Sequence, residues 1–143
     1  MKVSTRGRYA LRLMLDLALN NTGEPVRLKD VAKRQEISEK YLEQIISILN
    51  KAGFVKSVRG PAGGYSLKRK PEEYTVGMIL RLTEGSLAPV SCLTPGASTC
   101  SRMANCRTYE MWKGLNELIT DYFGKIPLAD LALPDQAGND YVI

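Results

Sequence analysis

The spacing of the apolar residues changes at residue 54. Before it, residues 38–53 (SEKYLEQIISILNKAG) predict a helix with one buried face, because four apolar side chains fall at i, i+3, i+4 and i+7: Leu42, Ile45, Ile46 and Leu49. Gly53 is expected to end this helix, in the position favoured for a left-handed cap. After it, FVKSV (54–58) and GYSLKR (64–69) predict two strands, joined by the Gly- and Pro-rich loop RGPAGG (59–64). The sequence therefore predicts a helix followed directly by a narrow hairpin.

Two further helices are expected before residue 38. STRGRYALRLMLDLAL (4–19) predicts a helix whose apolar face is formed by Tyr9, Leu13 and Leu17 with Ala10 and Met14. Ser4 or Thr5 can cap its first turn. VRLKDVAKRQ (26–35) predicts a short helix, and the turn EIS separates it from the next helix, for which Ser38 is a good N-cap. A short helix, a tight turn, a longer helix and a hairpin predict a winged helix-turn-helix, which is a mostly α fold with a small β-hairpin wing.

The second half of the chain has a different organisation. We divide the chain into a winged helix-turn-helix DNA-binding domain (1–74) and a second part (75–143). Helices are expected at 74–85 and 106–126, with one more turn at 128–133, and the last ten residues are expected to be frayed. The helix at 106–126 is amphipathic, and its apolar residues are expected on one side: Met111, Trp112, Leu115, Leu118, Ile119 and Tyr122. Between the two helices lies a loop, 92–106, that holds all three cysteines of the chain.

The helix at 38–53 has a polar face opposite its apolar one. This face carries Lys40, Glu43, Gln44 and Ser47, with Tyr41 at its flank. In a major groove Gln pairs with adenine, Glu accepts from cytosine, and Lys binds guanine or phosphate. The alternative is an ordinary solvated face of a surface helix, which is more plausible for one residue than for the whole helix pair and hairpin.

The positive charge of the protein is concentrated in its first half. The net charge is +5, which divides into +7 over residues 1–74 (15 Lys/Arg, 8 Asp/Glu) and −2 over residues 75–143 (5 Lys/Arg, 7 Asp/Glu). Arg59, at the tip of the hairpin, is expected to enter a minor groove, where negative potential is concentrated. Candidate phosphate contacts are Lys2, Arg6, Arg8, Lys56, Lys68 and Arg69. A basic surface without a partner is the alternative.

Three cysteines lie within fifteen residues, in the spacing C-x7-C-x5-C: Cys92, Cys100 and Cys106. Thiolates suit iron–sulfur clusters and zinc, and the spacing differs from the C-x2-C pair of common zinc sites. The basic N-terminus lacks the features of a signal peptide, and no apolar run is long enough for a membrane span, so we expect a cytoplasmic protein with reduced thiols. The open alternatives are a cluster, a redox-sensing thiol set, a zinc site, or cysteines without a role.

An enzyme is not expected. The chain has no histidine to act as a base, and GPAGG is not followed by the Lys-Ser/Thr of a P-loop. A protein-interaction module that controls a metabolic enzyme, or a metal-storage or cluster-carrier protein, would also be compatible with the absence of a catalytic motif.

Three stretches resemble the Rrf-two family of bacterial transcription regulators, of the IscR and CymR type: STRGRYALRLMLDLAL, ISEKYLEQIISILNKAGFVKSVRGPAGGYSL, and the cysteine loop followed by TYEMWKGL. The resemblance implies a homodimer in which the helix from about 106 to 123 crosses its twin, on a near-palindromic operator in double-stranded DNA. It also implies DNA contacts from four residues of the recognition helix, Ser38, Tyr41, Glu43 and Gln44, and a wing contact from Arg59. Lys40 stands where some relatives have a small polar residue.

The resemblance further implies a 2Fe–2S cluster on Cys92, Cys100 and Cys106. Some family members supply the fourth ligand from a histidine, here replaced by Tyr109, and others from an aspartate, here replaced by Arg8. Tyr109, Glu110, another oxygen donor, a small thiol or water would then complete the shell. The function implied is that of a repressor modulated by its cluster. The alternative is a cluster-free regulator of cysteine metabolism, acting as a thiol switch or through a docked enzyme of cysteine or iron–sulfur metabolism.

Overall fold

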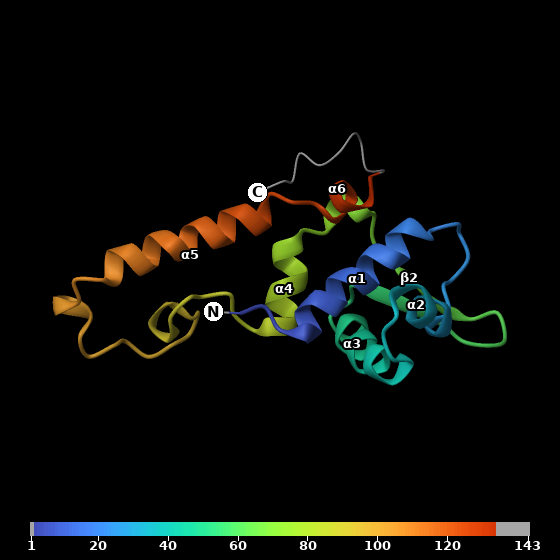
Figure 1. The fold of residues 1–143 in the computed structure, drawn as a ribbon, viewed down its shortest axis with the longest axis horizontal. Helices are drawn as coiled ribbons and strands as arrows, with labels where there is room; N and C mark the ends of the chain where they lie inside the picture. Colours follow the sequence, from blue (N-terminus) through green and yellow to red (C-terminus); the bar gives the residue numbers. More distant parts are fainter. Residues whose placement is uncertain (1, 134–143) are drawn as a thin grey trace.

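The computed structural model of the protein describes residues 2–133, and its architecture is mostly helical (Figure 1). The expectation of frayed residues at 134–143 falls outside the described part. The helices and strands are α1 (Thr5–Leu19), α2 (Leu28–Gln35), α3 (Glu39–Lys51), β1 (Val55–Val58), β2 (Gly64–Leu67), α4 (Val76–Glu84), α5 (Tyr109–Gly124) and α6 (Leu128–Ala132). Short 3-10 turns lie at Pro71–Glu73, Ser91–Leu93 and Met103–Asn105.

Helix α1 is the centre of the core. It contacts α2, α3, α4, α6 and β2. Four of its apolar side chains are buried, together with the apolar face predicted for α3: Ala10, Leu13, Met14 and Leu17, then Leu42, Ile45, Ile46 and Leu49. The helical spacing therefore predicted both inward faces.

The helix-turn-helix is formed by α2 and α3. Ser38 is the N-cap of α3, as predicted, and its hydroxyl accepts a hydrogen bond from the Tyr41 N–H at 3.1 Å. Gly53 has φ +76°, so the left-handed turn expected after α3 is present. Between the helices Glu36 has φ +55° and Ile37 is buried, which makes a sharp turn without glycine.

The hairpin is antiparallel, with Val55 opposite Leu67 and Val58 opposite Gly64. Its strands are shorter than predicted. Phe54 precedes β1, because its N–H bonds the Leu49 carbonyl and completes the end of α3 (2.9 Å).

The second strand also ends early. Lys68 and Arg69 follow β2, where the Arg69 N–H bonds the Tyr74 hydroxyl (3.0 Å). That hydroxyl donates to the Phe54 carbonyl at 2.6 Å, so the fully buried Tyr74 fastens the base of the wing.

Three predicted helices begin later than expected. Val26 and Arg27 have an extended backbone before α2, because Val26 pairs with Tyr65. Thr75 caps α4 and accepts a hydrogen bond from the Met78 N–H (3.1 Å), so α4 begins at Val76 rather than at 74. Helix α5 begins at Tyr109 and so excludes Cys106, which has an extended backbone.

The arm formed by α5 extends away from the core (Figure 1). None of its 16 residues is buried within the described chain. Helix α5 brings the chain back to the core, where the Val76 N–H bonds the Ile126 carbonyl (2.9 Å) and the Leu128 N–H bonds the Tyr74 carbonyl (2.8 Å). Leu128 is fully buried beside α1.

Within residues 2–133, no helix is both long and apolar enough to span a membrane.

Candidate nucleic-acid interface and cysteine loop

The polar face of α3 is open to solvent. The side chains of Lys40, Glu43, Gln44 and Ser47 are all exposed, and they make no hydrogen bond within residues 2–133. The Ser38 hydroxyl accepts the Tyr41 N–H, so its own proton stays available to donate to a phosphate or a base. The structure thus leaves these predicted side chains free to meet another molecule.

Tyr41 lies differently from the other predicted contact residues. Its ring is half-buried and packs edge-to-face on Tyr9 of α1, with the ring centroids 5.7 Å apart. The Arg12 guanidinium lies over the ring of Tyr9, 5.2 Å from its centroid. Tyr41 therefore fixes α3 against α1, and only part of its ring remains for a ligand.

A buried carboxylate holds α2 against α1. Asp16 is 2% exposed and accepts two hydrogen bonds from the Arg34 guanidinium, at 2.7 and 3.1 Å, and one from the Gln35 side chain at 3.0 Å. The Asn20 amide donates to the same carboxylate at 3.3 Å. Arg12 donates to the Gln35 carbonyl and side chain, which ties α1 to the end of α2 a second time. The bond to Asp16 raises the pKa of Arg34 above its usual value.

We expect Arg34→Ala to lower the free energy of unfolding by about 2 kcal/mol, because it leaves the Asp16 carboxylate buried without its cation. The estimate is below that for a fully buried pair since the Arg34 side chain is 41% exposed. Urea denaturation measures the loss. Lys33→Ala, which removes the same charge from an exposed position on α2, is the control, and equal stability of the two variants would contradict the role given to Asp16.

The wing tip presents Arg59 in an exposed, tightly closed turn. Gly60 has φ +107°, and the Gly63 N–H bonds the Gly60 carbonyl at 2.9 Å. A Cβ on Gly63 would lie 2.1 Å from the Val58 carbonyl oxygen, so the turn requires glycine there. The predicted phosphate contacts Lys2, Arg6, Arg8, Lys56, Lys68 and Arg69 are all exposed.

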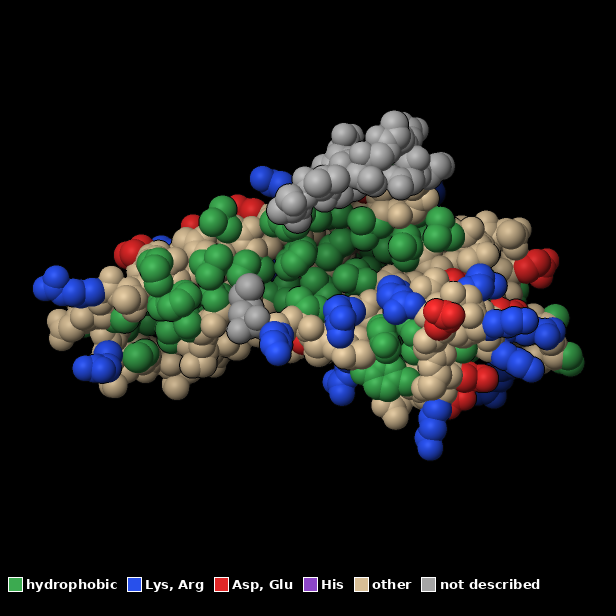
Figure 2. All heavy atoms as spheres, in the orientation of Figure 1, with side chains coloured by type: hydrophobic (Ala, Val, Ile, Leu, Met, Phe, Trp, Pro, Cys, Tyr) green, Lys and Arg blue, Asp and Glu red, His purple; other side chains and the backbone are tan. Residues whose placement is uncertain are grey.

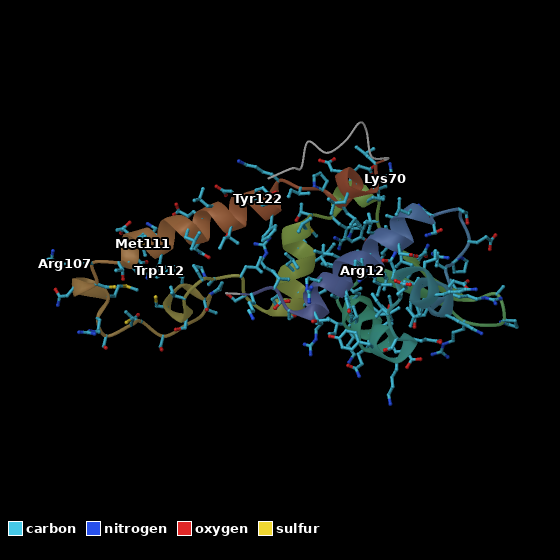
Figure 3. All side chains as sticks on the ribbon, viewed as in Figure 1. Arg12, Lys70, Arg107, Met111, Trp112 and Tyr122 are labelled. Atoms are coloured by element: carbon cyan, nitrogen blue, oxygen red, sulfur yellow. The ribbon has the colours of Figure 1, made fainter. Side chains whose placement is uncertain are left out.

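On the face shown in Figure 2, Lys and Arg side chains gather, with some Asp and Glu among them, over the end of the molecule that holds α1–α3 and the hairpin. Arg12, on α1, lies in this part, whereas Arg107 lies beyond the N-terminal end of α5 (Figure 3). The charge asymmetry of the sequence is therefore also an asymmetry in space.

The exposed side of α5 carries an apolar stripe. Met111, Leu118 and Tyr122 are 56%, 68% and 59% exposed, and with Leu115 they follow a 4-3-4 spacing. Trp112, Ile119 and Phe123 are half-buried, and the last two line a cavity of about 160 Å³ next to the start of α1. The sequence predicted one apolar side for α5, but the apolar residues lie on two sides. One side faces the protein's own loop and α4, and the other faces solvent (Figures 2 and 3).

The three cysteines lie on the loop that leaves α4 and runs outward beside α5 to the far end of the arm (Figure 1). Cys92 is half-buried in the turn Ser91–Leu93, and Cys100 and Cys106 are exposed. All three are free thiols, and in the described part of the chain no three Cys, Asp, Glu or His side chains are gathered closely enough to hold a metal. The donor chemistry suits iron, but the loop would have to draw its sulfur atoms together.

Cys106 has a distinct environment. Its sulfur lies 3.4 Å from the Thr108 hydroxyl, and this hydrogen bond lowers the pKa of the Cys106 thiol, with smaller contributions from the backbone and from Arg102. A lowered pKa favours the thiolate, which is the form that binds metals and reacts with oxidants. Tyr109 and Glu110 lie three and four residues after Cys106, in the first turn of α5, whereas Arg8 is on α1 and donates to Thr5.

The cysteine loop leaves α4 at a point that touches α1. Glu84, the last residue of α4, accepts hydrogen bonds from the backbone N–H and the hydroxyl of Ser4, at 3.0 and 2.5 Å. A Cβ on Gly7 would lie 2.3 Å from the same carboxylate oxygen. Gly85 follows with φ +81° and turns the chain toward the loop.

Comparison with known proteins decides the family. The model of the family Rrf2, described as "Iron-dependent Transcriptional regulator", matches residues 3–134. The chain belongs to the Rrf2 family. It is thus a transcription regulator, not an enzyme.

Individual Rrf2 relatives agree with this. The HTH-type transcriptional regulator IscR of Aliivibrio salmonicida is 41% identical over 136 residues, which cover 95% of this chain and 80% of that protein. CymR, the global cysteine regulator of B. subtilis, has 35% identity and a TM-score of 0.78, with 92% of this chain and 96% of CymR covered. The structure of T. potens IscR has 41% identity and a TM-score of 0.75, with 99% of this chain and 95% of that chain covered. The predicted winged helix-turn-helix fold is confirmed.

Two contacts of this Rrf2 protein could not be predicted from patterns in the sequence. The bond between Glu84 and Ser4 joins residues 80 positions apart, and the Arg27 guanidinium reaches the Pro61 carbonyl at the wing tip (2.9 Å). Neither follows from periodicity or from a motif. Gly7 and Gly64 gave a local hint, since glycine often marks a close approach of two segments.

Proposed function

We propose that this Rrf2 protein is a sequence-specific DNA-binding repressor that works in the cytoplasm as a homodimer. The observation that carries the proposal is a free polar face on α3 beside a closed, arginine-tipped wing. Lys40, Glu43 and Gln44 would read bases in a major groove, Ser38 and Tyr41 would flank them, and Arg59 would enter the adjacent minor groove. Lys2, Arg6, Arg8 and Lys56 would bind phosphates. Residues 1–74 would be the DNA-binding domain.

Arg59→Ala is the test of this interface. Fluorescence anisotropy on a duplex selected from a random pool should show about tenfold weaker binding, and any preference for A·T pairs under the wing should be lost. The binding of wild-type protein should fall steeply with salt, as phosphate contacts require. Unchanged affinity and unchanged base preference would contradict the wing contact.

The proposed dimer rests on the outward stripe of α5. Met111, Leu115, Leu118 and Tyr122 form an apolar seam with the spacing of a coiled coil, and a second copy of the same helix would cover it. Two subunits would present two copies of α3 to the half-sites of a near-palindromic operator. This assigns residues 75–143 to the linker helix, the cysteine loop (92–106) and the dimerisation helix.

We further propose that Cys92, Cys100 and Cys106 hold a 2Fe–2S cluster. The support is the set of three thiols on one loop, the lowered pKa of Cys106 and the similarity to IscR proteins. Tyr109 or Glu110, another oxygen donor, a small thiol or water would complete the ligand set. Because the protein would supply only part of its ligand shell, such a cluster would be labile. A shortage of iron or an oxidant would remove it and so change the conformation of the loop.

The contact between Glu84 and Ser4 offers a route from this loop to the DNA-binding surface. A change in the loop alters the direction in which the chain leaves α4, and Glu84 at that point holds the start of α1. Helix α1 carries Tyr9, against which Tyr41 of α3 packs. A displacement at Gly85 would therefore reach α3 through two direct contacts.

A second candidate is a regulator without a cluster, in which the cysteines act as a thiol switch, alone or with a docked enzyme of cysteine or iron–sulfur metabolism. The exposure of Cys100 and Cys106 and the lowered pKa of Cys106 favour it. It predicts iron-free protein whose operator binding changes with peroxide and recovers with a thiol reductant.

A further inference from the structure

The wing is fastened to the segment that precedes α2. Val26 and Tyr65 exchange two backbone hydrogen bonds, of 2.7 and 2.8 Å, so a single antiparallel bridge joins this segment to β2. Gly64 lies against this segment, and a Cβ there would be 2.4 Å from the Val26 carbonyl oxygen. The base of the wing is therefore fixed relative to the helix-turn-helix.

Arg27 extends this attachment to the tip of the wing. Its guanidinium donates to the carbonyl oxygen of Pro61 at 2.9 Å, two residues beyond Arg59. A hydrogen bond from a charged donor is stronger than a neutral one. Together with the turn closed by Gly60 and Gly63, it limits the directions in which the tip can point.

We propose that Arg27 is a positioning residue for Arg59. It holds the tip in one orientation before DNA arrives, and this reduces the ordering cost that binding would otherwise carry. Arg27 acts on DNA through the wing and not by touching a phosphate itself. The inference rests on the proposed minor-groove contact of Arg59.

A double-mutant cycle tests the coupling. Affinity for the selected duplex is measured for the wild-type dimer, Arg27→Ala, Arg59→Ala and the double variant. We expect about fivefold weaker binding for Arg27→Ala, from one lost hydrogen bond, and a double variant that binds no more weakly than Arg59→Ala. Losses that multiply would show an independent phosphate contact and overturn the positioning role. A single variant Arg59→Ala without any loss would instead overturn the wing contact itself, and the inference with it.

Lys29→Ala is the matched control, because Lys29 is an exposed cation two residues further on. Any loss of DNA affinity in Lys29→Ala should multiply with the loss in Arg59→Ala, because the two side chains are not coupled.

A measurement without DNA separates orientation from charge. Nitrogen-15 relaxation should show lower order parameters for the Gly60 and Ala62 amides in Arg27→Ala and unchanged values in Lys29→Ala. Equal rigidity of the tip in Arg27→Ala and wild type would overturn the proposal even if Arg59 binds DNA.

Discussion

Leu118→Glu should convert the protein to a monomer and reduce operator affinity by about 100-fold or more. The side chain is 68% exposed in one subunit, at the middle of the apolar stripe of α5, so a carboxylate there would be buried without a partner in the proposed dimer. A monomer binds a single half-site and loses the gain, on the order of 10² or more, that comes from linking two binding modules. Light scattering gives the mass, and anisotropy gives the affinity.

Two controls make this result specific. Lys113→Glu adds a carboxylate to α5 away from the stripe and should leave the dimer intact. The circular dichroism of Leu118→Glu should match that of the wild type, because no core side chain is removed. A dimeric Leu118→Glu with wild-type affinity would place the subunit interface elsewhere.

Cys106→Ala should abolish cluster binding. Anaerobically purified wild-type protein should carry about two irons and two acid-labile sulfides per chain and show charge-transfer bands in the visible spectrum. The variant should lose the bands and most of the iron, because only two of the loop's three thiolates remain.

Ser101→Ala, in the same loop, should keep the wild-type iron content. Variant protein with as much iron and sulfide as the wild type would exclude Cys106 as a ligand. Wild-type protein that stays colourless and iron-free after anaerobic reconstitution would favour the thiol switch.

The spacing of apolar residues and the capping residues predicted the helices α1 and α3, because these features depend on residues close together in the sequence. The period of the apolar residues placed α1 and α3 within two residues at either end, and Ser38 and Gly53 cap α3 as expected. The polar face opposite the buried one followed from the same periodicity, so the exposed positions of Lys40, Glu43 and Gln44 were also predictable.

Contacts between distant segments could not be predicted in this way. The hydroxyl of Tyr74 ends the second strand early, and the pairing of Val26 with Tyr65 delays the start of α2. The apolar residues of α5 were expected on one side, but helical spacing alone does not tell which of them meet the protein's own loop and which meet solvent. The loop cysteines follow no period, so their positions were not predicted either.

The most direct test of the account compares the cluster-loaded and cluster-stripped protein on one duplex, selected from a random pool and measured anaerobically by fluorescence anisotropy. We predict a near-palindromic site, and affinities for the two forms that differ by about tenfold or more, because the loop and α3 are connected through Glu84 and α1. Equal affinities of the two forms would contradict regulation by the cysteine loop, and the absence of any enriched sequence would contradict the proposed role in operator recognition.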